Sequence, residues 1–188
     1  RRERPAGPVL ILVPAVPGSA VHLPCSRDVP STCLPNVGVV AAPTSGVTMP
    51  MIDVYAPEGI FADPQALAQD LARAVMRWEV VPDIPLFADN TASMIHFLPR
   101  TSMSTAAGGS DFVRVQVLTP AGVLDRDKQL GVVRELTMIV SEAAENPGLA
   151  DRTWVLITES PDGGWGIAGH ANTGTDIAEQ ARKLLHGN

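Results

Sequence analysis

One short pattern occurs twice in this chain, 63 positions apart, and each copy separates a predicted strand from a predicted helix. Pro57-Glu-Gly59 is followed by Ile60-Phe61, and Pro120-Ala-Gly122 is followed by Val123-Leu124. With the same shift, Leu67 falls on Leu130. A repeat of this kind indicates that one supersecondary unit has been duplicated within the chain.

The first copy of the unit reads as strand, helix and strand. Residues 51–56 alternate apolar and polar side chains, which is typical of a half-buried strand. Asp63-Pro64 predicts a helix start, because aspartate caps the first turn and proline is tolerated at the first helical position. The helix should run to about Val80, and a second strand is expected over residues 93–98. The predicted buried face of the helix consists of Leu67, Leu71, Ala74, Val75 and Trp78.

The second copy repeats this plan. Residues 113–118 match the first strand, Asp125 matches the helix cap, and residues 154–158 close the unit. The apolar stripe of the second helix is predicted at Leu130, Val133, Leu136 and Ile139. Two tandem βαβ units predict an α/β fold of the two-layer α+β kind, with a four-stranded sheet and both helices on one face. We expect the other face to be apolar and to be covered by oligomerisation.

Residues 1–48 differ sharply in composition from the rest. They hold 8 of the 17 prolines, both cysteines (Cys25 and Cys33) and a net charge of +2, in a chain whose formal net charge is −6. Prolines interrupt helices and strand ladders alike. We expect residues 1–48 to be a disordered leader or translated upstream sequence, with Met49 as the true start. Residues 50–188 then form one domain, with repeats at about 50–100 and about 112–188.

The cellular compartment can be predicted from the start of the chain and from the distribution of its cysteines. Arg1 and Arg2 precede a short apolar run, but prolines interrupt it, and no cysteine follows residue 33 to exploit an oxidising compartment. A cytoplasmic protein is therefore predicted over an exported one. No segment has the roughly 18–20 apolar residues of a membrane span. An acidic domain is a poor partner for nucleic acid, so neither a membrane nor a nucleic acid is expected as a partner.

Two stretches of the sequence resemble the tautomerase superfamily, whose founding member is 4-oxalocrotonate tautomerase. The first is the start at Pro50, followed by the strand over residues 51–56 and by Pro57-Glu-Gly59. The second is Val155-Leu-Ile-Thr-Glu159 followed by Gly163-Gly-Trp-Gly-Ile-Ala-Gly169, in the family's order and spacing. The resemblance covers nearly all of 50–188 and none of 1–48. It implies a fused, two-unit member of the superfamily, and such members are typically trimers.

The resemblance implies that an amino-terminal Pro50 is the catalyst. Burial of an amine disfavours the ammonium form and lowers its pKa, which suits a general base near neutral pH. Only a free amine can act in this way, so Met49 must be removed. The repeat counterpart of Pro50 is Val113, so one active proline per chain is expected. The predicted function is a cofactor-independent tautomerase or isomerase that moves a proton in a small keto-enol acid or related carbonyl compound. The alternative is a non-catalytic trimer of the same fold that serves as a binding or scaffold protein.

The chain also departs from the family's pattern. Ile60, Val123 and Trp154 stand where dicarboxylate-specific members have arginine, so a bidentate carboxylate clamp of that kind is missing. Arg114 is the best replacement, and Arg100 and Arg152 are weaker ones. The predicted substrate-binding residues are Trp165, Arg114, Ile60 and His96.

Each of these residues also has a purely structural interpretation. Trp165 could be packing in a turn, and Arg114 a solvated strand end. His96 fits a hydrogen-bonded structural histidine better than an acid. The four histidines show no metal-ligand spacing, and no metal or cofactor is expected. Gly164-Trp-Gly166-Ile-Ala-Gly169 mimics a dinucleotide motif, but it lacks a following strand with an acidic ribose ligand.

Overall fold

A computed structural model describes residues 49–186 of the chain. The expectations for residues 1–48, including those for Cys25 and Cys33, lie outside the described residues. The first half contains β1 (Met51–Pro57), α1 (Pro64–Glu79), α2 (Pro85–Ala88), β2 (Ala92–Leu98) and a 3-10 turn, η1 (Arg100–Ser102). The second half contains β3 (Val113–Pro120), α3 (Arg126–Ala143), a 3-10 turn η2 (Pro147–Arg152), β4 (Thr153–Ser160), β5 (Trp165–Ile167), β6 (His170–Asn172) and α4 (Gly174–His186).

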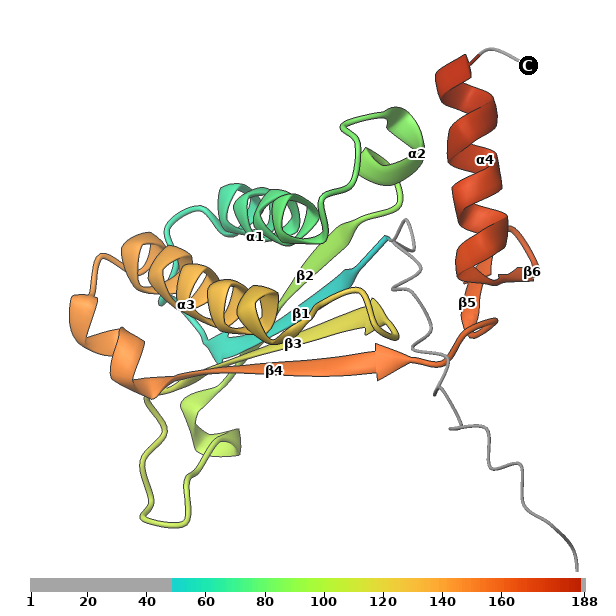
Figure 1. The fold of residues 1–188 in the computed structure, drawn as a ribbon. Coiled ribbons are helices and arrows are strands. Elements are labelled where there is room, and N and C mark those ends of the chain that lie inside the picture. Colours follow the sequence, from blue (N-terminus) through green and yellow to red (C-terminus); the bar gives the residue numbers. More distant parts are fainter. Residues whose placement is uncertain (1–48, 187–188) are drawn as a thin grey trace, which may run out of the picture. The chain divides into compact units, whose positions relative to one another are not determined.

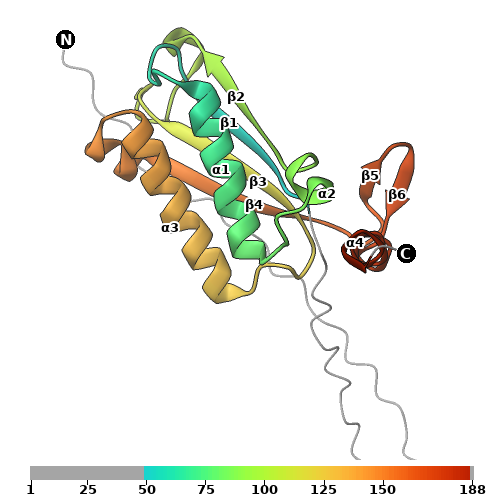
Figure 2. The same cartoon turned by 90° about the horizontal axis from the view of Figure 1, so that it is seen from above.

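The four long strands form one sheet in the order β2-β1-β3-β4. β1 is parallel to β2 and β3 is parallel to β4, whereas β1 and β3 run antiparallel at the centre. α1 and α3 both lie on the same face of this sheet (Figures 1 and 2). The structure therefore confirms two βαβ units with both helices on one side, the α/β fold of the two-layer α+β kind that the repeat predicts.

Both predicted helix starts are confirmed by their hydrogen bonds. The Asp63 carboxylate accepts from the backbone N–H of Ala66 at 2.9 Å, and the Asp125 carboxylate accepts from that of Lys128 at 2.9 Å. Each bond satisfies one of the N–H groups that the first helical turn leaves without an intrahelical partner. The two units thus begin their helices by the same local chemistry, as expected of a duplication.

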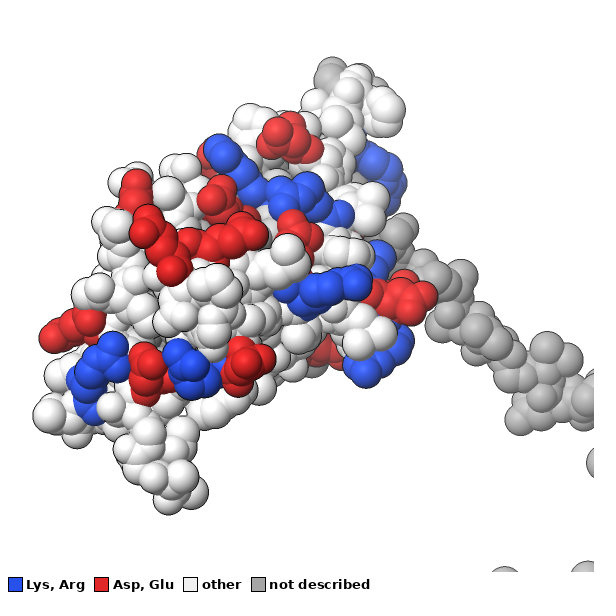
Figure 3. Space-filling model, turned by 90° about the vertical axis from the view of Figure 1, so that its left-hand side faces the viewer, with Lys and Arg blue, Asp and Glu red and all other residues white. Residues whose placement is uncertain are grey.

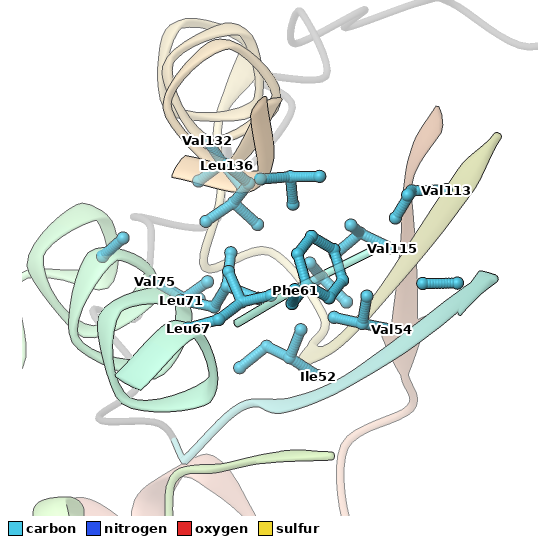
Figure 4. Packing of buried hydrophobic residues seen from close by; sticks show 14 of the residues in the cluster. Ile52, Val54, Phe61, Leu67, Leu71, Val75, Val113, Val115, Val132 and Leu136 are labelled. Atoms are coloured by element: carbon cyan, nitrogen blue, oxygen red, sulfur yellow. The ribbon is translucent and has the colours of Figure 1, made fainter. Parts of the chain in front are cut away.

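The main core lies between the sheet and the two helices (Figure 4). Ile52, Val54 and Val115 on the central strands are fully buried, and the side chain of Phe61 packs in the same cluster. On α1 the predicted face is confirmed: the buried residues include Leu67, Leu71, Ala74 and Val75, with Trp78 packed at the edge.

The predicted stripe on α3 is partly wrong. Leu136 is buried and Ile139 packs against the core, but Leu130 is 50% exposed and Val133 is 38% exposed. The buried positions are instead Val132, Leu136 and Val140. The side of α3 that faces α1 is the one with Gly131, which lies against the indole of Trp78. The indole N–H also donates to Glu135 at 2.6 Å, which fixes the ring over α3.

This contact gives a stability prediction for Gly131. A Cβ atom added there would overlap the ring of Trp78. Alanine favours a helix by about 1 kcal/mol over glycine, but overpacking at a helix contact costs about 1–3 kcal/mol and occasionally more. Gly131→Ala should therefore lower the free energy of unfolding, measured by urea denaturation.

Gly148→Ala is the matched control, because the nearest atom to an added Cβ there is Asn146 Oδ1 at 3.5 Å, an ordinary contact. It should leave the denaturation midpoint close to that of the unmodified protein. A Gly131→Ala variant at least as stable as the unmodified protein would show that α1 and α3 can move apart freely.

The face of the sheet without helices is not the apolar surface expected from the sequence. Its centre carries a polar network built on Tyr55. The His96 ring stacks on Tyr55 with centroids 4.7 Å apart, and the Arg114 guanidinium lies 5.3 Å from the Tyr55 centroid. His96 Nε2 is 2.6 Å from an oxygen of Asp53, and Arg114 donates to Gln116 at 2.7 Å. Only the outer strands expose large apolar side chains on this face.

These apolar residues are Met94 on β2 and Trp154 and Leu156 on β4, each between 43% and 45% exposed. Their strand positions pair with Asp53, Arg114 and Gln116, so they share the face of the polar network. The expectation of an apolar face was wrong because alternation in β1 and β3 places Asp53, Tyr55, Arg114 and Gln116 outward. An interface on this face would be apolar at its margins and polar at its centre.

Ion pairs hold the connection between the two units. Asp111 binds Arg100 at 3.2 Å and Arg152 at 3.0 Å, which ties the loop before β3 to η1 and η2. Acidic and basic side chains lie side by side on the face of the molecule shown in Figure 3. Such exposed pairs are worth little individually, so they fix the course of this loop more than they stabilise the fold.

Candidate active site at the start of β1

Pro50 is buried immediately before β1. Its carbonyl accepts from the backbone N–H of Ala92 at 3.3 Å, which extends the pairing of β1 with β2. Met51 pairs with Ala92 on β2 and with Leu118 on β3. Continued by one residue, this register sets Pro50 between Thr91 and Thr119. The side chains of all three then point to the face covered by the helices, because side chains alternate along a strand.

Trp165 lies at the same end of the sheet. It is 7% exposed and belongs to a small hydrophobic cluster with Met49, Phe87, Ile177 and Ala181. Met49 is covalently bonded to Pro50 and is itself 1% exposed. The structure therefore brings Trp165 and the Pro50 junction together, although they are separated by more than a hundred positions in the sequence.

The position of Trp165 is fixed by the hairpin of β5 and β6 and by α4, which the sequence analysis did not predict. The buried side chain of Asn172 donates to the carbonyls of Trp165 at 3.3 Å and His170 at 3.1 Å. α4 begins with a reciprocal cap between Thr173 and Asp176. The backbone N–H and the hydroxyl of Thr173 donate to this carboxylate and hold the pKa of Asp176 below its usual value.

A buried carboxylate, Glu79, also lies at this end of the sheet. It is 5% exposed, and its Oε1 accepts from the Thr119 hydroxyl at 2.6 Å. The sequence analysis missed Glu79, although a signal was available. Glu79 follows Val75 by four positions and Leu71 by eight, so it continues the apolar face of α1. Glutamate is almost never fully buried unless it is paired, so its place in this pattern marks it out.

Two buried hydroxyls lie on the β2 side of Pro50. Thr91 is 8% exposed, and neither its Oγ1 nor the Oγ of Ser93 has a hydrogen-bond partner among the described residues. A buried hydroxyl without a partner costs free energy. The surroundings of Pro50 thus combine an apolar wall with polar groups on both neighbouring strands.

The other predicted substrate-binding residues lie at the opposite end of β1. Arg114 and His96 both pair with Tyr55, about 16 Å along the strand from Pro50 at roughly 3.3 Å per residue. Ile60 lies in the turn after β1 and packs on the main core. Within one chain, Arg114, His96 and Ile60 are therefore not beside Pro50. Their contacts fit structural roles, and the hydrogen bond of His96 to Asp53 is the clearest of these.

Residues 49–186 contain no group of three or more His, Cys, Asp or Glu side chains that could hold a metal ion. None of the helices described here has the length and apolar character needed to cross a membrane.

The arrangement is similar to several solved structures. A fused 4-OT in an asymmetric trimer shares 21% identity, with a TM-score of 0.55 over 66% of this chain and 96% of that one. A fused 4-OT in a symmetric trimer shares 16%, with a TM-score of 0.57 over 67% and 97%. N1, a member of the cis-3-chloroacrylic acid dehalogenase family, shares 17%, with a TM-score of 0.54 over 73% and 96%.

No protein-family profile matches the sequence, and no curated protein matches it either. The likeness is therefore one of fold: this chain holds two βαβ units, and the match covers nearly the whole length of each of these structures. The chain has the fold of the fused, two-unit members of the tautomerase superfamily.

Proposed function

We propose that this protein is a cofactor-independent tautomerase or isomerase that moves a proton in a small keto-enol acid or a related carbonyl compound. Pro50 is the general base once residues 1–49 are absent. The observation that carries the proposal is the burial of Pro50 at the start of β1, within a tautomerase fold and beside the cluster that holds Trp165. A cytoplasmic location goes with this proposal, because no cysteine follows residue 33.

The reaction needs only one nitrogen lone pair. The Pro50 amine accepts a proton from the enol hydroxyl or from a carbon next to a carbonyl, which leaves an enolate and a prolinium ion. In ketonisation the prolinium then returns the proton to carbon: the carbon–carbon π electrons of the enolate form the C–H bond, and the oxygen electrons form the carbonyl. A proton taken from carbon is instead returned to the enolate oxygen or to another carbon of the conjugated enolate. The amine lies beside the apolar cluster that includes Phe87 and Trp165. Burial beside such groups disfavours the charged form of the amine and keeps a fraction of it unprotonated near neutral pH. General-base catalysis of this kind is typically worth about 10²–10⁴-fold.

Trp165 is proposed as the wall of the substrate pocket. Trp165→Ala should raise KM more than it lowers kcat in the ketonisation of phenylenolpyruvate, because it removes apolar contact and leaves the amine in place. His96→Gln is the matched comparison, since His96 lies at the other end of β1 and binds Asp53. It should leave both constants nearly unchanged. A large loss of kcat in His96→Gln would assign that histidine to the chemistry.

We propose a homotrimer as the assembly. Both fused 4-OT structures described above are trimers, and the sheet face without helices exposes Met94, Trp154 and Leu156 around its polar centre. Arg114, Ile60 and His96 could then reach a Pro50 site only from a neighbouring protomer. Sedimentation equilibrium should give three times the chain mass. A monomer at micromolar concentration would contradict the trimer and leave that face without a cover.

A second candidate is a non-catalytic trimer that binds a partner or serves as a scaffold. It is favoured by the fact that Pro50, when preceded by Met49, is part of an amide and cannot act as a base. Met49 is itself well packed, at 1% exposure. Intact mass of the protein from its native source separates the two candidates. A chain that begins at Pro50 supports the enzyme, and one that retains Met49 supports the binding protein.

A further inference from the structure

Glu79 is the one ionisable side chain among the buried residues of the described part of the chain. From its place next to Pro50 we propose that Glu79 is a positioning residue that holds the protonated Pro50 amine by an ion pair. The proposal deepens the function proposed above and rests on it, because it requires a free amine at Pro50. It concerns a residue that the mechanism so far does not use.

The placement follows from the strand register. Thr119 is the next residue after Leu118 on β3, and Leu118 pairs with Met51, so Thr119 lies across from Pro50. Thr119 and Pro50 both face the helices, on the same side as Val117 and Ile52, which are fully buried. Neighbouring strands lie about 5 Å apart. The Glu79 carboxylate, hydrogen-bonded to the Thr119 hydroxyl at 2.6 Å, is therefore held next to the position of the amine.

Thr91 supplies a second acceptor on the other side. A protonated secondary amine has two N–H donors, and two acceptors are needed to satisfy both when it is buried. The Thr91 hydroxyl lies next to Pro50 just before β2, is 8% exposed and has no hydrogen-bond partner among the described residues. Glu79, held from α1 by Thr119 of β3, and Thr91, just before β2, thus lie on the two sides of Pro50, and each can accept one N–H.

The charge of Glu79 affects the proton-transfer step directly. When Pro50 removes a proton from the substrate, a positive charge develops in a site walled by Phe87 and Trp165. A carboxylate already held there stabilises this charge more strongly than it would in water. It also raises the pKa of the amine and opposes the lowering that burial causes. Glu79 therefore sets how much of the amine is protonated at neutral pH.

Other charged side chains on the surrounding elements are more exposed than Glu79. On α1 these are Asp70, Arg73 and Arg77, and Arg77 is paired with Glu135. Those beside α2, at the end of β4, in the β5–β6 hairpin and on α4 are Asp83, Asp89, Glu159, Asp162, His170, Glu179, Arg182, Lys183 and His186. Asp176 at the start of α4 is bound to Thr173. Solvent screens exposed charges strongly, so the largest single effect on the Pro50 amine is expected from Glu79.

The experiment measures the pKa of the Pro50 amine without substrate. Protein translated from Met49 and carrying nitrogen-15 proline is first checked for amino-terminal Pro50 and for a cooperative thermal transition. The nitrogen shift of Pro50 is then titrated. Glu79→Gln should lower the pKa by about one to three pH units, the range for loss of an opposite charge within about 4–6 Å. Glu142→Gln, an exposed position on α3, should leave it unchanged.

Glu79→Asp keeps the charge and retracts it by one methylene, so it should give a pKa between those of the unmodified protein and Glu79→Gln. If the Gln variant lacks a cooperative transition, Glu79→Asp alone must still show a lowered pKa. An unchanged pKa in a folded variant would overturn the inference, as would a Pro50-initiated protein that does not fold.

Activity of the same samples separates this inference from the function on which it rests. A lowered pKa in Glu79→Gln without any ketonisation of phenylenolpyruvate by the unmodified protein would contradict the proposed function and leave the role of Glu79 intact. Ketonisation by the unmodified protein, together with an unchanged Pro50 pKa in Glu79→Gln, would support the proposed function and contradict the role of Glu79. In an active protein, the ascending limb of the pH profile of kcat/KM should move to lower pH in Glu79→Gln by the same interval as the amine.

Discussion

Pro50→Ala, in protein that begins at residue 50, should slow the ketonisation of phenylenolpyruvate by up to about 10²–10⁴-fold, the usual value of general-base assistance. Alanine still offers an amino-terminal amine, but a primary amine has a different basicity and its direction is not fixed by a ring. The fall should appear in kcat, because the apolar wall formed by Trp165 and Phe87 is unchanged.

Pro85→Ala is the matched control for this substitution. Pro85 is exposed at the first position of α2 and has no place in the proposed chemistry. Its replacement should leave kcat and KM as they are. A Pro50→Ala protein with the full rate would mean that another group takes the proton, and the buried carboxylate of Glu79 would be the first to test.

The parts of the fold that local chemistry controls could be predicted from the sequence. Asp63 and Asp125 were expected as helix caps and are observed as caps. The four long strands were expected within one or two residues of their observed bounds. Alternation along a strand and capping of a first helical turn depend on residues a few positions apart, so one sequence is enough to identify them.

The errors arose where distant residues decide the outcome. Leu130 and Val133 fit a helical stripe, yet α3 turns them outward because the Trp78 ring lies over Gly131. No local sequence pattern in α3 predicts that an indole from another helix packs against it. The polar network of Tyr55, His96 and Arg114 likewise forms only when β1, β2 and β3 lie side by side.

The candidate site was predictable only in part. Pro50 and Trp165 came from a resemblance to a family, and the structure sets both at one end of the sheet. Ile60 stands where arginine is expected and Arg114 is its nearest substitute, but both lie at the other end of β1 within one chain. Glu79 could have been found, since it continues the buried face of α1. Its partner Thr119 could not, because it lies 40 positions away.

The state of the Pro50 nitrogen is the central claim, and the most direct test compares two forms of the same protein. One form is translated from Met49 and matures to Pro50, and the other is the full chain from Arg1. The pockets of the two forms share every side chain from Pro50 onward, but in the full chain the Pro50 nitrogen is an amide. Assayed for ketonisation of phenylenolpyruvate at equal concentration, the Pro50-initiated protein should be active and the full chain inactive. Equal activity of the two forms would contradict the proline mechanism, because an amide nitrogen cannot accept the proton.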